Sequence, residues 1–229
     1  YYMSTHPGLV TPEVVNAGRL YVRNVIELAR ERLRNKGIAI EPRIADMAER
    51  LAAVEHVDHL RFRTEVHKNI YDDIYTLYAL NEGQTYRYSV SSAGAGGMVQ
   101  MIPSTYRMVR SWHPNVPLDP DFVDGMRNHV NATEAMLIYM KRTWEDLIAS
   151  PTVTGALETG IATPEQLMAA GYNSNPARLA GCRTVGEVLA LAVAATSGEA
   201  DAATPAKAAM TRLISMAAAM TAPIVGSNH

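Results

Sequence analysis

Cysteine, charge imbalance and long apolar runs are all scarce in this chain, and each absence excludes something. A single cysteine, Cys182, among 229 residues excludes an intrachain disulfide. No run of 18 apolar residues is present, so no membrane-spanning segment is expected. The 21 basic and 23 acidic residues give a net charge of −2, which does not indicate a nucleic-acid partner.

Clustered metal ligands are also scarce. The seven histidines are scattered, and only His56 and His59 share a helical spacing. Without a cysteine or a close third ligand, packed or solvated histidines are favoured over a zinc site. We therefore expect no metal and no cofactor.

Helical patterns fill most of the chain. Thr11 and Pro12 are a typical helix start, and Gly37 a typical end. A second helix is expected after Pro42 and a third from about 64 to 81. Two stripes of mostly apolar residues recur at helical spacing. The first consists of Val15, Val22, Ile26, Ala29 and Leu33. The second consists of Val130, Thr133, Leu137, Met140, Trp144 and Leu147.

The C-terminal third continues this pattern. TPEQ at 163–166 and TVGE at 184–187 have the spacing of capping boxes. The alanine-rich segment after about 197 predicts one more helix. Strand alternation never exceeds a few residues, so the fold class is mainly α.

One carboxylate follows a row of phenols. Tyr71, Tyr75, Tyr78 and Glu82 share one face of the third predicted helix. Burial there, together with the negative end of the helix dipole, would raise the pKa of Glu82 and make it a general acid. A tyrosine-rich core face ending in a solvated glutamate is the alternative interpretation.

No acidic residue follows Glu82 until Asp119. Glycosidases normally use two carboxylates, so a site with one needs a nucleophile from elsewhere, such as the substrate itself. Folding back of Asp72, Asp73 or Asp146 is the alternative.

The segment NEGQTYRYSVSSAGAGGMVQMIPSTY contains a longer motif. Ser91 lies nine positions after Glu82 and Gln100 lies eighteen after it, with GAGGMVQ at 94–100. LDPDFVDGMRNHVNATEAML and MAAGYNSNPARL follow in order. These segments, spanning roughly 65–180, resemble the soluble-type lytic transglycosylase domain, which is related to goose-type lysozyme.

The resemblance implies a fold and a function. The fold would be lysozyme-like, an α+β class with minimal β, with an N-terminal helical extension (1–60), a catalytic domain (61–196) and an alanine-rich tail (197–229). The substrate would be peptidoglycan glycan strands in the periplasm or cell envelope. Glu82 would cleave the MurNAc-β-1,4-GlcNAc bond without water, leaving 1,6-anhydro-MurNAc. The N-terminal helices would pack on the catalytic part or dock a protein partner.

The resemblance also implies roles for single residues. Tyr172 would hold Glu82 by a hydrogen bond, Ser91 would position the substrate, and Asn173 would support the cleft wall. Gln100 would bind an N-acetyl or hydroxyl group. Met98 would offer an apolar surface to a sugar, and the glycines would let backbone approach the sugar closely.

Several positions depart from the family pattern. Gly83 replaces the usual serine after the glutamate, and Gly171 replaces an alanine. A muramidase that uses water, a non-catalytic peptidoglycan-binding module and a helical interaction protein therefore stay open as alternatives.

Overall fold

Helices dominate the fold. The computed structural model describes residues 6–174 and 181–197, apart from the side chains at 59, 169, 173, 174 and 192–197. Within these residues, strand pairing is limited to two isolated antiparallel bridges in the glycine-rich loop, Val90 with Gly96 and Gly96 with Met101. The prediction of a mainly helical protein is confirmed, whereas the lysozyme-like arrangement stays a prediction.

The chain forms two compact units, Tyr1–Arg142 and Thr143–His229. The boundary between them lies within helix α7 (His129–Ile148). This division differs from the predicted domains, because the N-terminal helices share a unit with the helix that leads to Glu82. The two units are described separately below.

Helix α1 (Pro12–Asn35) opens the first unit. The Thr11 side chain accepts a hydrogen bond from the Val14 amide, and Gly37 follows the helix with φ of +81°. Both predicted ends are therefore confirmed. All five residues of the first predicted stripe are buried, so that face of α1 belongs to the core.

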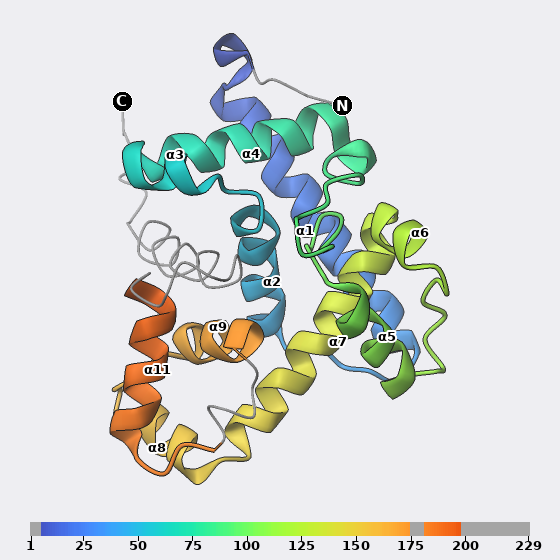
Figure 1. Ribbon diagram of the computed structural model, residues 1–229. Coiled ribbons are helices and arrows are strands. Elements are labelled where there is room, and N and C mark those ends of the chain that lie inside the picture. Colours follow the sequence, from blue (N-terminus) through green and yellow to red (C-terminus); the bar gives the residue numbers. More distant parts are fainter. Residues whose placement is uncertain (1–5, 175–180, 198–229) are drawn as a thin grey trace, which may run out of the picture. The chain divides into compact units, whose positions relative to one another are not determined.

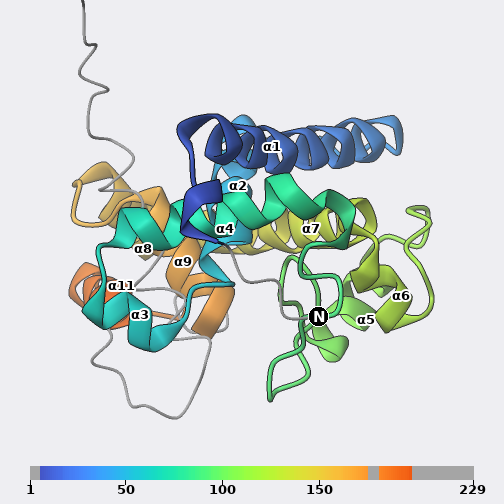
Figure 2. The same cartoon turned by 90° about the horizontal axis from the view of Figure 1, so that it is seen from above.

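Helix α1 packs against α4 (His67–Asn81), as Figures 1 and 2 show. Gly18 permits this contact, because a Cβ there would lie 1.8 Å from the carbonyl oxygen of Tyr75. Helix α2 (Pro42–Val54) contacts both helices. The Tyr78 hydroxyl of α4 donates to the carbonyl oxygen of Ala52 in α2 at 2.8 Å, which fixes that ring from a second helix.

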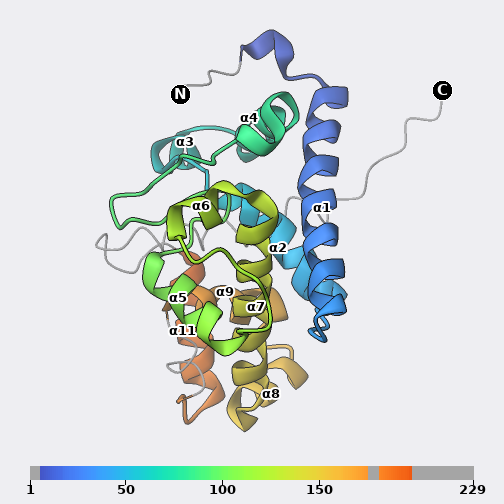
Figure 3. The same ribbon diagram turned by 90° about the vertical axis from the view of Figure 1, so that its right-hand side faces the viewer.

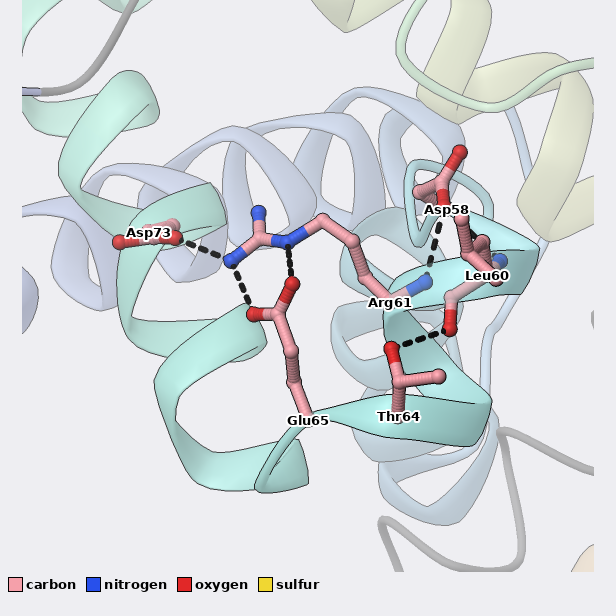
Figure 4. A network of polar contacts seen from close by, with 6 residues as sticks. All are labelled: Asp58, Leu60, Arg61, Thr64, Glu65 and Asp73. Atoms are coloured by element: carbon pink, nitrogen blue, oxygen red, sulfur yellow. Dashed lines mark hydrogen bonds and ion pairs between the residues drawn. The ribbon is translucent and has the colours of Figure 1, made fainter.

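A short helix, α3 (His59–Thr64), precedes α4, so the third predicted helix begins three residues later than expected. The Asp58 carboxylate caps α3 by accepting from the amides of Leu60 and Arg61 at 2.8 and 2.9 Å. Figure 4 shows the Arg61 guanidinium between Glu65 and Asp73. This network ties α3 to α4.

The rest of the first unit surrounds the glycine-rich loop. A 3₁₀ turn, η2 (Glu82–Gln84), follows α4, and after the loop come α5 (Pro103–Trp112) and α6 (Phe122–Arg127). Helices α5 and α6 lie side by side in Figures 2 and 3. The Tyr106 hydroxyl of α5 donates to the carbonyl oxygen of Asp119 and accepts from Asn131 in α7, which joins these elements.

The second unit contains α8 (Pro151–Glu158), α9 (Pro164–Ser174) and α11 (Val185–Ser197), with α11 contacting both of the others (Figure 1). Thr163 and Gln166 exchange two hydrogen bonds, so the first predicted capping box is confirmed. At the second, Thr184 caps the Glu187 amide, while the Glu187 carboxylate accepts from Arg183 instead. The helix predicted after 197 lies outside the described residues.

Candidate active site

Glu82 ends helix α4 at the start of the loop. It is the C-cap residue of α4 and the first residue of η2, and its φ of 39° lies in the left-handed region. Its side chain is exposed, whereas Tyr71, Tyr75 and Tyr78 are buried. The predicted burial of Glu82 is therefore wrong. The helical spacing holds only as far as Asn81, where the backbone turns and carries residue 82 away from the tyrosine face.

Tyr21 of α1 lies close to the turn that carries Glu82. A Cβ on Gly83 would lie 3.8 Å from the Tyr21 hydroxyl oxygen. Burial raises the pKa of Tyr21 to about 12, and the negative charge of Glu82 contributes. The Tyr21 phenol therefore stays protonated beside the turn that carries Glu82.

An aromatic cluster lies behind this turn. Tyr78 is at its centre, stacked with Tyr21 at 6.2 Å between ring centroids and meeting Tyr86 edge-on at 5.3 Å. The His56 ring stacks on Tyr86 at 3.5 Å. These rings come from α1, the segment after α2, α4 and the loop, so several segments hold the cluster behind the turn.

His129, near the start of α7, links the cluster to the turn. Its Nδ1 lies 2.8 Å from the Tyr21 hydroxyl oxygen, and its Nε2 lies 2.7 Å from the carbonyl oxygen of Thr85. Burial lowers the pKa of His129. Neither Tyr21 nor His129 was assigned a role from sequence, because they are 108 positions apart and belong to no shared motif.

Ser91 and Gln100 both close the glycine-rich loop. The Ser91 hydroxyl accepts from the Ala95 amide at 3.1 Å. The Gln100 side-chain nitrogen donates to the carbonyl oxygens of Ser89 and Gly97 at 3.1 and 2.9 Å. Gln100 has a φ of 46°, so these bonds hold a rare backbone conformation in place. Both predicted site residues therefore shape the loop.

Met98 and one of the loop glycines, Gly97, serve packing. Met98 is 0% exposed, so the expected apolar surface for a sugar is absent, and its carbonyl oxygen accepts from His56 Nε2 at 2.9 Å. Gly97 has φ of +70°, and a Cβ there would lie 2.5 Å from the carbonyl oxygen of Met126. The carbonyl of Met126 in α6 therefore accounts for the glycine at this position.

Two of the three candidate second carboxylates are ion-paired. Asp72 pairs with Lys68 and lies 3.7 Å from Arg19. Asp73 pairs with Arg61 at 2.6 Å (Figure 4). The third, Asp146, belongs to the second unit. The pairing of Asp72 and Asp73 with basic residues favours the one-carboxylate interpretation of Glu82.

Tyr172 and Asn173 lie in the last turn of α9, in the second unit. The Tyr172 side chain is half-buried, and nothing is described of the Asn173 side chain. Pro176 of the same motif lies outside the described residues. The roles of Tyr172 and Asn173 therefore stay predictions from the resemblance.

An exposed aromatic residue follows Glu82 along the loop. The Tyr88 ring is 55% exposed, and the guanidinium carbons of Arg87 and Arg127 lie 4.8 and 5.0 Å from its centroid. Cation–π contacts with two arginines hold the ring at the surface.

The described residues contain neither a metal-binding cluster nor a membrane-spanning helix. Among the described residues, no group of three or more His, Cys, Asp and Glu side chains is placed to hold a metal ion. Within the same residues, no helix combines the length and apolarity needed to cross a bilayer. Cys182 is half-buried, and burial raises the pKa of its thiol, which disfavours a reactive thiolate.

Comparisons of the chain with family models, curated proteins and solved structures gave no match.

Proposed function

We propose that the protein is a peptidoglycan lytic transglycosylase, with Glu82 as its only acid–base carboxylate. The observation that carries the proposal is the ordered motif in which Ser91 and Gln100 follow Glu82 by nine and eighteen positions. Two further features support it. Glu82 is accessible at the end of α4, and Asp72 and Asp73 are neutralised in ion pairs.

The proposed reaction is an intramolecular transfer. Glu82 donates its proton to the oxygen that bridges MurNAc and GlcNAc, and the bond to C1 of MurNAc breaks. The carboxylate then takes a proton from the C6 hydroxyl of MurNAc, whose oxygen attacks C1 and closes the 1,6-anhydro ring. The N-acetyl group of MurNAc assists at C1 in place of a second carboxylate. No water is consumed, and Glu82 ends protonated again.

The other site residues divide between two kinds of role. Ser91 and Gln100 hold the glycine-rich loop in shape through the bonds described above. Met98 supports the same loop from the core. On the basis of the resemblance alone, Tyr172 is proposed to hold Glu82 by a hydrogen bond and Asn173 to support the cleft wall.

A muramidase is the second candidate, and the exposure of Glu82 favours it. Water that reaches this carboxylate could be activated for attack on C1, giving a hydrolytic product. The two reactions yield products that differ by the mass of one water, so mass spectrometry separates them.

The Glu82→Gln variant tests the proposal. An amide cannot donate the proton, so kcat on purified sacculi should fall by about 10²-fold or more. Glu158→Gln is a matched control, because Glu158 is also an exposed carboxylate at the end of a helix, α8. A loss below tenfold in Glu82→Gln, or an equal loss in the control, would contradict the assignment.

A further inference from the structure

We infer that Tyr21 and His129 are positioning residues for Glu82, acting through a hydrogen-bonded chain that ends on the turn carrying this carboxylate. Their effect on catalysis rests on the proposed function, whereas the hydrogen-bonded chain itself does not. Two contacts define the chain: Tyr21 Oη lies 2.8 Å from His129 Nδ1, and His129 Nε2 lies 2.7 Å from the Thr85 carbonyl oxygen.

The hydrogen bonds of this chain all run in one direction, from Tyr21 through His129 to Thr85. A carbonyl oxygen only accepts hydrogen bonds, so Nε2 of His129 must carry a hydrogen and donate it to Thr85. Burial lowers the pKa of His129 below its ordinary value of 6.5; the hydrogen bond to Thr85 opposes this shift and the charge of Arg87 adds to it, so the ring is mainly neutral at neutral pH. A neutral imidazole that is protonated at Nε2 has a lone pair at Nδ1. The Tyr21 hydroxyl must therefore donate to Nδ1, which leaves its oxygen facing the turn as an acceptor.

Thr85 passes this constraint to Glu82. The Thr85 amide donates to the carbonyl oxygen of Glu82 at 2.9 Å, and its hydroxyl donates to the carbonyl oxygen of Leu77 at 3.0 Å. Thr85 is 1% exposed. The Thr85 amide thus closes the η2 turn and its hydroxyl ties the turn to α4, while His129 bonds to the carbonyl oxygen of the same residue.

The turn needs such support. Glu82 and Tyr86 have φ values of 39° and 57°, which side-chain-bearing residues rarely adopt. Conformations of this kind persist where surrounding contacts over-determine them. Because the Glu82 side chain is exposed, few contacts of its own fix it, and its backbone position determines where the carboxylate can reach.

Helices outside the segment of the resemblance (roughly 65–180) anchor the hydrogen-bonded chain. Tyr21 belongs to α1, and its ring stacks on Tyr78, whose hydroxyl is bonded to Ala52 of α2. Both α1 and α2 precede residue 65, where the resemblance begins. The N-terminal helices therefore contribute to the site, beyond packing on it.

Tyr21→Phe tests the inference most narrowly, because it removes one hydroxyl and keeps the ring. We expect kcat on sacculi to fall about tenfold with KM changed less than twofold. We also expect faster hydrogen exchange of the Thr85 amide. Tyr75→Phe is the matched control, since the buried Tyr75 hydroxyl has no hydrogen-bond partner. It should change neither quantity.

The histidine provides a second, activity-independent test. Nitrogen NMR of labelled wild-type protein near neutral pH should show His129 protonated at Nε2 and not at Nδ1. His129→Gln, which keeps a side-chain N–H donor, should retain more kcat and slower Thr85 exchange than His129→Leu.

An Nδ1-protonated or doubly protonated ring, or unchanged Thr85 exchange in Tyr21→Phe, would overturn the inference. Unchanged kcat in Tyr21→Phe would overturn its catalytic part. A wild type inactive on sacculi would contradict the proposed function, while the exchange and NMR results would still decide whether the chain holds the turn.

Discussion

Among single residues, Glu134 links pH to stability. Its side chain in α7 is 4% exposed and lies 3.1 Å from Arg32 of α1. Burial raises the pKa of Glu134 above its ordinary value of 4.5, although Arg32 opposes the shift. The folded protein therefore binds more protons than the unfolded chain above that ordinary value. The free energy of unfolding should fall as pH rises from there through the folded-state pKa.

Glu134→Gln should remove this contribution, because an amide does not titrate. Urea unfolding at several values between about pH 4 and pH 7 would measure it, with a flatter profile expected for the variant. Glu31→Gln is the control, since Glu31 is 61% exposed and lies 4.0 Å from Arg34. Wild-type and Glu134→Gln profiles of equal slope would refute the prediction.

Alanine substitutions at Gly97 and Gly94 distinguish the destabilisation caused by a steric clash from that caused by backbone strain. Both have positive φ, but a Cβ meets the Met126 carbonyl only at Gly97, and at Gly94 it meets nothing within 4 Å. We expect Gly97→Ala to lower the free energy of unfolding by about 2–3 kcal/mol, and Gly94→Ala by about 1 kcal/mol. Chemical denaturation measures both, and equal losses would show that α6 does not constrain the loop.

Only some features of the proposed site could be predicted from the sequence. The resemblance grouped Glu82, Ser91 and Gln100, and in the structure Glu82 begins the η2 turn while the Ser91 and Gln100 side chains bond to loop backbone. The exposure of Glu82 was not predictable, because it depends on where α4 ends and on one positive φ. The Tyr21–His129 contact was not predictable either, since it depends on how α1 packs.

At the scale of elements, the α1–α4 contact depends on Gly18. A methyl group at this position would lie 1.8 Å from the Tyr75 carbonyl oxygen, so the two backbones would have to separate. Gly18→Ala should lower the free energy of unfolding by about 3 kcal/mol or more, although alanine favours helices. Because α1 carries Tyr21, kcat should fall as well.

Ala17→Gly, on the exposed side of α1, is the control for Gly18→Ala. It should cost about 1 kcal/mol through helix propensity alone, with kcat unchanged. Denaturant unfolding and activity on sacculi provide the comparison. A Gly18→Ala protein as stable as wild type would show that the α1–α4 contact is looser than described.

Helix boundaries were well predicted where local chemistry decides them. Thr11 and Gly37 bound α1, and Thr163 with Gln166 forms a reciprocal cap before α9. The predicted start of α4 is three residues too early. A separate helix, α3, ends at Thr64, and its Arg61 pairs with Asp73 of α4. Periodicity alone does not reveal such a pair.

For the whole molecule, helical content was evident from sequence but the division into units was not. We expected a boundary near residue 60, where the resemblance begins. In the structure the first unit continues to Arg142, because α1 packs on α4 and α7 supplies His129 and Glu134. Which helix faces pair depends on side-chain fit over long sequence separations, and periodicity carries no information on it.

The central claim is that Glu82 catalyses an intramolecular transfer on peptidoglycan. Mass spectrometry of sacculi digested by the wild type and by Glu82→Gln tests it most directly. The account predicts muropeptides with 1,6-anhydro ends, each lighter by one water than a hydrolytic product, from the wild type and almost none from the variant. Hydrolytic products from the wild type, or equal amounts of anhydro products from both proteins, would contradict it.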